Sequence, residues 1–176
     1  MINSGPVLLA MNHQSYLDPP LGGNATDRPI YYLMRRNLLN APVLGKILPK
    51  LNVIPVDQEG IDRGALKKLI QVVRAGNGAL IFPEGSRTMD GSLQPGQPGI
   101  GLVIAKTRAP VVPMRIFGAY DALPRRGGFS FARITVVVGR PIYFTDADFA
   151  GAGKDVYGRL SQRVMDEIAA LQLDES

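Results

Sequence analysis

A single histidine and a nearby aspartate follow the first apolar run of the chain. The run Val7–Met11 leads directly into Asn-His-Gln-Ser-Tyr-Leu-Asp-Pro-Pro, which begins at Asn12. The side chains of His13 and Asp18 would meet if the chain turns between them and Asp18 opens the next helix as an N-cap. The carboxylate would then hold one imidazole nitrogen and leave the other as a general base. The alternative is an ordinary loop histidine beside a capping aspartate.

A second polar segment follows the apolar run Ala79–Phe82 and has the composition of an anion-binding loop. It consists of Pro83, Glu84, Gly85, Ser86, Arg87 and Thr88. Gly85 allows a ligand to approach the backbone closely, the two hydroxyls can donate hydrogen bonds, and the Arg87 guanidinium offers a planar fork that suits phosphate. The alternative is a polar turn in which Arg87 pairs with Glu84.

The sequence shows no obvious nucleophile for covalent catalysis. It has no cysteine and no Gly-x-Ser-x-Gly pattern, and Ser15 lies too close to His13 to act with it. We therefore expect the nucleophile to be a substrate hydroxyl that His13 deprotonates for attack on an acyl carbon, while backbone N–H groups or a cation stabilise the oxyanion. One histidine without cysteine gives no good metal site, and the phosphate-loop glycine patterns are absent, so we expect no metal and no cofactor.

Charge and length limit the partners and the domain count. Lys and Arg number 20 against 15 Asp and Glu, which gives +5 and a pI near 9.7. This charge suits phosphate, an anionic lipid headgroup or nucleic acid, or it serves solubility alone. The absence of Trp and an aromatic content of 7% argue against nucleic acid. We expect one domain over residues 1–176, with no secretory signal and no transmembrane run, that is soluble or lies on a membrane surface.

Short Val-, Ile- and Leu-rich runs alternate with segments of helical period. This alternation predicts an α/β fold with a mostly parallel central sheet of about six or seven strands flanked by helices. The predicted strands are Val7–Met11, Ile30–Met34, Asn52–Val56, Ala79–Phe82, Val111–Ile116 and Ile134–Val138. Amphipathic helices are predicted between Ile61 and Ala75, with Gly76 as the stop, and from Val156 to Leu171. Both polar segments would then lie where strands end.

Two further segments permit more than one interpretation. Ile100–Lys106 is apolar on nearly all sides, which favours a buried helix over one that touches lipid. Arg35–Leu51 combines apolar residues with cations and prolines. It would lie in a membrane interface or form a solvated helix packed on the sheet.

The order and spacing of the two polar segments resemble the glycerolipid acyltransferase family typified by 1-acylglycerol-3-phosphate (lysophosphatidate) acyltransferase. The resemblance rests on Asn12-His13-x4-Asp18 followed by Phe82-Pro83-Glu84-Gly85-Ser86-Arg87-Thr88. A third family block, a proline within an apolar strand, is matched by Ala109–Met114. The resemblance extends from about residue 6 to about residue 142.

The resemblance implies a role for each matching residue. His13 would be the general base, Asp18 would orient it and stabilise its charge, and Asn12 would support the motif. Pro113 would lie near the acyl-donor channel, and the donor would be acyl-CoA or an acylated carrier protein. The acceptor and its phosphate would be bound by Glu84, Gly85, Ser86, Arg87 and Thr88, with Gln58 and Arg63 as further candidates.

Two departures from the family pattern bear on the acceptor and the membrane. The family usually ends a strand between the two motifs with an arginine that helps to hold the acceptor phosphate, but here the position is Gln58. Gln supplies no charge, so Arg63 or a basic residue near Arg35 would have to replace it. Relatives usually carry amphipathic or membrane helices before the first strand. Here the motif starts at Asn12, so the chain is either naturally short or truncated.

The resemblance therefore implies an acyltransferase of phospholipid biosynthesis that converts 1-acylglycerol 3-phosphate to phosphatidate. It would be a peripheral protein on the cytoplasmic side of a membrane, with the lipid surface, the two substrates and a carrier protein as partners. One alternative is another acceptor: glycerol 3-phosphate, a different lysophospholipid or a lyso-aminolipid. The other is a non-catalytic module that binds anionic lipid.

Overall fold

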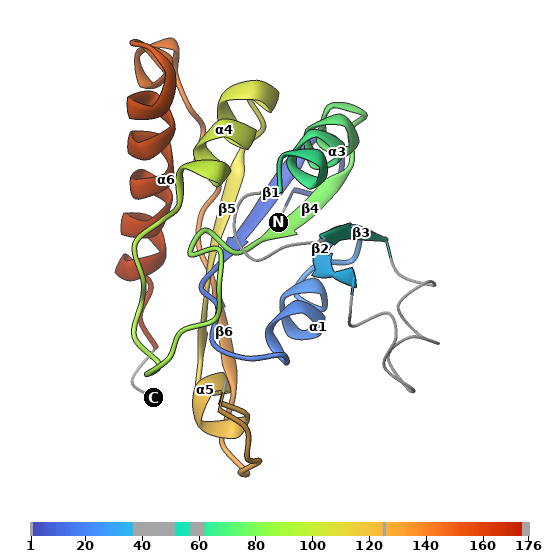
Figure 1. Ribbon diagram of the computed structural model, residues 1–176, viewed down its shortest axis with the longest axis vertical. Coiled ribbons are helices and arrows are strands. Elements are labelled where there is room, and N and C mark those ends of the chain that lie inside the picture. The colour runs from blue at the N-terminus through green and yellow to red at the C-terminus, as the bar shows by residue number, and fades with distance from the viewer. Residues whose placement is uncertain (1, 37–51, 57–61, 125, 174–176) are drawn as a thin grey trace.

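The computed structural model describes residues 2–36, 52–56, 62–124 and 126–173 and contains a six-stranded sheet with helices on both faces (Figure 1). The strands are β1 (Val7–Met11), β2 (Ile30–Arg35), β3 (Val53–Val56), β4 (Gly78–Ile81), β5 (Val111–Phe117) and β6 (Thr135–Val138). They lie in the order β3-β2-β4-β1-β5-β6; the first five are parallel, and β6 is antiparallel to β5. The strand that carries the histidine at its end is therefore central.

The helices lie between these strands and after the last one. They are α1 (Asp18–Gly23), α3 (Arg63–Arg74), α4 (Pro98–Thr107), α5 (Ala119–Ala122), the 3-10 helix η3 (Asp146–Phe149) and α6 (Gly153–Ala170). Helix α3 begins where the Asp62 side chain accepts a hydrogen bond from the N–H of Ala65 at 3.0 Å. Past its end, Gly76 adopts φ +90, which confirms it as the stop.

Alternate strand residues feed two hydrophobic cores, one on each face of the sheet. Leu8 and Ala10 of β1 pack into the core shared with α3, α4 and α6. Val7, Leu9 and Met11 pack into the other core, which includes residues of α1 and α5. All five side chains of β1 are buried, as expected for a central strand covered on both faces.

Helix α4 packs against α6 at very short range (Figure 1). A Cβ atom at Gly101 would lie 1.9 Å from the backbone oxygen of Tyr157, so only glycine permits this approach. Ile100, Val103 and Ile104 are buried in the same contact. The apolar segment is therefore a buried helix, as the sequence favoured.

The structure confirms the predicted α/β class and all six predicted strands, with ends shifted by at most one residue. The segment Arg35–Leu51 lies largely outside the described residues, and both interpretations of it stay predictions. In the part of the chain that the structure describes, no helix is long and apolar enough to cross a membrane.

Candidate active site

The site forms where β1 and β4 end side by side at the carboxyl edge of the sheet. Parallel pairing of these strands brings the segment after Met11 next to the segment after Ile81. Asn12, buried at the end of β1, fixes this edge to β5: its Nδ2 donates to the backbone oxygen of Ile116 at 3.1 Å, and the N–H of Ile116 donates to its Oδ1 at 2.8 Å. The amide of Asn12 therefore satisfies both backbone groups of Ile116.

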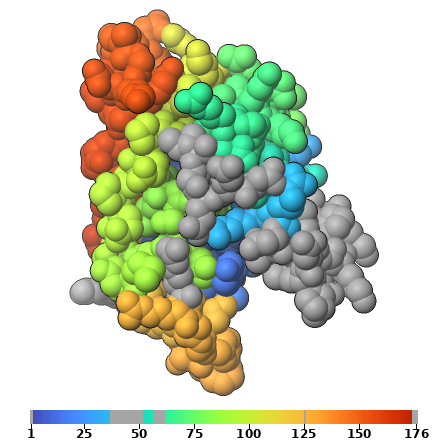
Figure 2. Space-filling view, viewed as in Figure 1, coloured from blue at the N-terminus to red at the C-terminus, as the bar shows by residue number. Residues whose placement is uncertain are grey.

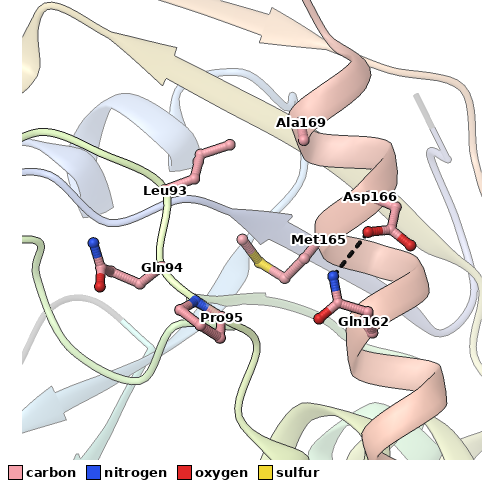
Figure 3. Close-up of a pocket in the computed structure, with 7 residues that line it drawn as sticks. All are labelled: Leu93, Gln94, Pro95, Gln162, Met165, Asp166 and Ala169. Carbon is pink, nitrogen blue, oxygen red and sulfur yellow. Dashed lines mark hydrogen bonds between the residues drawn. The ribbon is translucent and has the colours of Figure 1, made fainter.

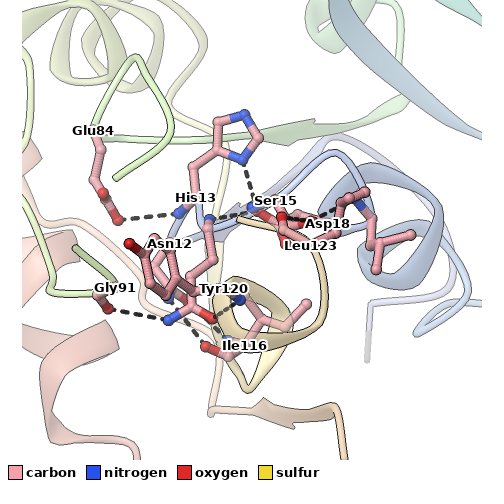
Figure 4. Close-up of polar contacts among 11 residues, drawn as sticks. Asn12, His13, Ser15, Asp18, Glu84, Gly91, Ile116, Tyr120 and Leu123 are labelled. Atoms are coloured by element: carbon pink, nitrogen blue, oxygen red, sulfur yellow. Dashed lines mark hydrogen bonds and ion pairs between the residues drawn. The ribbon is translucent and has the colours of Figure 1, made fainter. Parts of the chain in front are cut away.

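The structure brings His13 and Asp18 into direct contact (Figure 4). Nδ1 of His13 lies 2.7 Å from Oδ2 of Asp18, which also accepts the backbone N–H groups of Gln14 at 2.5 Å and Ser15 at 2.7 Å. The Asp18 side chain is fully buried, whereas the His13 side chain keeps 17% of its area exposed. A carboxylate at this place favours the imidazole tautomer with the proton on Nδ1 and directs the Nε2 lone pair away from it.

Asp18 is not the helix cap that the sequence predicts. It is the first residue of α1, Leu17 occupies the cap position, and no side chain caps the helix. The carboxylate instead turns back to the two N–H groups that precede it in the chain. Its hydrogen bonds therefore order residues 12–17, called here the catalytic loop after the candidate base His13, rather than the helix.

The second polar segment holds the backbone of His13 from both sides. Oε1 of Glu84 accepts the N–H of His13 at 3.1 Å, and the N–H of Thr88 donates to the backbone oxygen of His13 at 2.8 Å. The ring of Phe82 stacks on the imidazole with centroids 3.9 Å apart and planes 16° apart. The two motifs therefore form one structural unit, and His13 is fixed through its backbone, its Nδ1 atom and its ring face.

Burial raises the pKa of Glu84 from 4.5 to about 7, and the nearby charge of Asp18 adds a smaller effect in the same direction. Hydrogen bonds from the N–H groups of His13 and Gln94 oppose this shift. The exposed fraction of Glu84 is 4%. Glu84 is therefore a buried carboxyl group whose charge changes near neutral pH, and it bonds directly to the backbone of the candidate base, His13.

The rest of the predicted acceptor loop lies beside His13. Gly85 and Ser86 are exposed, and Gly85 adopts φ +73 in the turn closed by its N–H to Phe82. Arg87 is half-buried, with its guanidinium carbon 3.5 Å from the centre of the Tyr16 ring. The side chain of Thr88 is buried and bonds to Asp90 at 3.0 Å, so Thr88 shapes the loop rather than facing solvent.

Two predicted residues lie away from this loop, and a third falls outside the described residues. Pro113 is buried inside β5, next to Ala10 in register. Arg63 is exposed in the first turn of α3, and no contact among the described residues joins it to the cluster of His13 and Asp18. Gln58 lies outside the described residues.

Sequence reasoning missed the polar residues that tie the catalytic loop to its neighbours (Figure 4). Nε2 of Gln14 donates to the backbone oxygen of Gly91 at 3.2 Å, and its Oε1 accepts the N–H of Tyr120 at 3.2 Å. The Ser15 hydroxyl donates to the backbone oxygen of Leu123 at 2.9 Å. Both residues are buried polar groups in the first motif, but their partners lie 77 to 108 positions away in sequence.

A separate pocket of about 280 Å³ lies between the segment 93–95 and α6 (Figure 3). It is lined by Leu93, Gln94, Pro95, Gln162, Met165, Asp166 and Ala169. The lining is mostly apolar and does not include His13 or Asp18. In the described ranges, no group of three or more His, Asp or Glu residues could hold a metal ion.

The fold and this edge of the sheet define an α/β protein with a histidine–carboxylate pair at the ends of parallel strands. A family model described as Acyltransferase matches residues 1–117, which include both motifs. The chain therefore belongs to the acyltransferase family.

Two proteins similar in sequence to this chain are named for the same activity. The chain is 29% identical over 153 residues to the chloroplastic 1-acyl-sn-glycerol-3-phosphate acyltransferase BAT2 of Brassica napus, a match that covers 81% of this chain and 42% of that protein. It is 28% identical over 146 residues to the 1-acyl-sn-glycerol-3-phosphate acyltransferase of Bacillus subtilis, with 81% and 69% covered. The chain thus spans less than half the length of its plant relative.

The fold also matches a solved structure. The crystal structure of the 1-acyl-sn-glycerophosphate (LPA) acyltransferase PlsC of Thermotoga maritima superposes with a TM-score of 0.70 at 20% identity. The match covers 97% of this chain and 69% of that one. It confirms the fold.

Proposed function

We propose that the chain transfers a fatty acyl group from an acyl thioester to the free hydroxyl of 1-acylglycerol 3-phosphate, which gives phosphatidate. The observation that carries this proposal is that three groups meet at Oδ2 of Asp18: Nδ1 of His13 and the backbone N–H groups of Gln14 and Ser15. Family membership and the names of the similar proteins support the reaction class and the acceptor.

The chemistry follows from the orientation of the imidazole. Nε2 of His13 accepts the proton of the acceptor hydroxyl while its oxygen attacks the thioester carbonyl. The buried charge of Asp18 stabilises the imidazolium that forms. The C–S bond then breaks, the imidazolium returns the proton to the departing thiolate, and an ester and a free thiol are released. The substrate supplies the nucleophile, so no enzyme-bound acyl group is required.

The acceptor phosphate would lie against the loop of the second motif. Arg87 provides a bidentate fork, and the exposed backbone at Gly85 and the hydroxyl of Ser86 can approach the same anion. Glu84 and Thr88 would act by shaping this loop around His13. Gln58 and Arg63 are proposed as accessory contacts.

The acyl donor would be acyl-CoA or an acylated carrier protein, and Pro113 is proposed to lie near its channel. No cofactor is proposed. Because both substrates are amphiphiles, the reaction would take place at a membrane surface on its cytoplasmic side, with the protein bound peripherally.

The first experiment is thiol release from acyl-CoA, with 1-acylglycerol 3-phosphate in mixed micelles as acceptor. We expect wild-type turnover and none above background for His13→Ala. Substantial activity of the variant would refute the assignment of the base. Acceptors that differ in headgroup then test the alternative that Gln58 favours, and an acyl carrier protein replaces acyl-CoA to test the donor.

A further inference from the structure

The connection between α5 and β6 presents two uncovered aromatic side chains. Residues 124–133, called here the aromatic tip, include Phe129 with 69% and Phe131 with 98% of its area exposed. Their rings contact each other edge to face, with centroids 5.3 Å apart and planes at 80°. Single exposed apolar side chains are common on protein surfaces, but a contacting pair that projects from the molecule indicates a surface to which something binds.

The backbone of the aromatic tip is held in place by hydrogen bonds and glycine geometry. The N–H of Ser130 donates to the oxygen of Ala122 at 2.9 Å, and the N–H of Gly127 donates to Pro124 at 3.1 Å. Gly127 and Gly128 adopt φ +90 and +98, so the turn of the chain at these two positions depends on glycine. Phe129 and Phe131 follow these glycines, two positions apart, and therefore lie together at the outer end of the aromatic tip.

The aromatic tip is rich in positive charge. The sequence of the aromatic tip contains Arg125, Arg126 and Arg133 and no Asp or Glu. Arg126 and Arg133 are exposed. Apolar aromatic side chains combined with arginines fit the boundary between lipid headgroups and acyl chains, where the rings enter the apolar layer and the guanidinium groups meet phosphates.

The aromatic tip projects from the end of the molecule at which the catalytic loop lies (Figures 1 and 2). The Ser15 hydroxyl bonds to Leu123, directly before the tip, and the Tyr120 hydroxyl donates to the backbone oxygen of Met89 at 2.9 Å. Tyr16 and Met89, beside these contacts, are themselves 52% and 49% exposed. The tip and the catalytic loop therefore share one end of the fold.

We propose that the aromatic tip docks the protein on an anionic lipid surface by inserting Phe129 and Phe131 among the headgroups. This proposal rests on the proposed function, because docking at this end would bring the loop of His13 to the layer that holds a lipid acceptor. Charge argues against a second copy of the chain as the occupant, since two tips face to face would bring their arginines together.

The test is flotation with vesicles of phosphatidylcholine mixed with phosphatidylglycerol and with vesicles of phosphatidylcholine alone. We expect Phe129→Ser/Phe131→Ser to weaken binding to the anionic vesicles by about 10- to 100-fold. The matched control is Tyr143→Ser, because Tyr143 is 67% exposed but follows Ile142, which pairs with the opposite end of β5. Arg126→Gln/Arg133→Gln should weaken binding roughly fivefold per arginine, and Lys154→Gln should not.

Four results would overturn the docking proposal: no binding by the wild type, equal binding of the wild type to neutral and anionic vesicles, wild-type binding by the double phenylalanine variant, or an equal loss for Tyr143→Ser. Sedimentation velocity adds a fifth, since a dimer that the double phenylalanine variant dissociates would make a second copy the occupant.

Transfer to a short-chain, water-soluble lysophosphatidate separates docking from catalysis. The double phenylalanine variant should keep wild-type turnover on that acceptor and lose turnover on an acceptor embedded in vesicles. Vesicle binding by a wild type that acylates neither acceptor would refute the proposed function and leave the docking site standing.

Discussion

Replacing Asp18 by Asn separates the charge of the carboxylate from its architectural role. Oδ2 of Asp18 accepts hydrogen bonds from His13 and from the N–H groups of Gln14 and Ser15. Asparagine has the same shape and keeps an oxygen for the two backbone donors, so the loop should keep its turn. What disappears is the negative charge opposite the imidazole. We therefore expect Asp18→Asn to fold normally and to lose activity.

The size of the loss follows from the geometry. With Nδ1 of His13 2.7 Å from Oδ2 of Asp18, the centres of charge of imidazolium and carboxylate lie roughly 4 Å apart. At an effective dielectric constant of about 20, two unit charges at that distance attract by about 4 kcal/mol. The imidazolium exists only once the proton is transferred, so this attraction acts in the transition state. We expect kcat to fall by about 10³-fold and the acceptor KM to change little.

The assay is thiol release at saturating acyl-CoA and varied 1-acylglycerol 3-phosphate, with urea unfolding of the same preparations. Asp27→Asn is the matched control because Asp27 is an exposed aspartate past the end of α1. It should keep the wild-type kcat. A kcat for Asp18→Asn within about tenfold of wild type, with an unchanged unfolding midpoint, would refute the reasoning that this charge makes His13 a base.

Arg87→Ala should raise the acceptor KM more than it lowers kcat, whereas Arg163→Ala on α6 should change neither; an unchanged KM would exclude the phosphate role. Because burial raises the pKa of Glu84 from 4.5 to about 7, its contribution to stability is present below 4.5 and lost as the pH rises through about 7. The free energy of unfolding, measured with urea between about pH 5 and pH 8, should therefore fall as the pH rises, and this fall should be about 3 kcal/mol smaller in Glu84→Gln than in the wild type. Equal falls in the two proteins would contradict the raised pKa of Glu84. Asn12→Ala should cost about 2–4 kcal/mol of unfolding free energy, since it leaves both backbone groups of Ile116 without their buried partner; an unfolding midpoint like that of wild type would show that these groups find other partners.

The strands were predictable because the central ones are buried on both faces. Val7–Met11 is apolar at every position, and its length of five residues is typical of a buried strand and too short for a buried helix. Helix α5 and η3 were not predicted, because four residues are too few to show a helical period. The ends of strands shifted by one residue because hydrogen bonding to neighbours, rather than apolarity, decides where a strand stops.

The pairing of His13 with Asp18 was predictable because only four residues separate them in the sequence, so a single turn of the loop brings them together. The three hydrogen bonds that meet at Oδ2 of Asp18 were not, since sequence contains no information on where backbone N–H groups point. The stacking of Phe82 on the imidazole also escaped prediction, because it depends on the register between β1 and β4. The capping role expected for Asp18 was wrong because its carboxylate accepts the N–H groups of Gln14 and Ser15, which precede it, rather than those of α1.

The contacts between the two motifs involve only part of the sheet. His13 and Gln14 bond directly to the segment 84–91, and Asn12 bonds to β5, so the candidate site is built by the three neighbouring strands β4, β1 and β5. The chain between α1 and β4 supplies β2 and β3, on one side of these strands, and helix α3. A chimera that exchanges this stretch between relatives would therefore take these hydrogen bonds around His13 from one parent and the β2–β3 side of the sheet from the other.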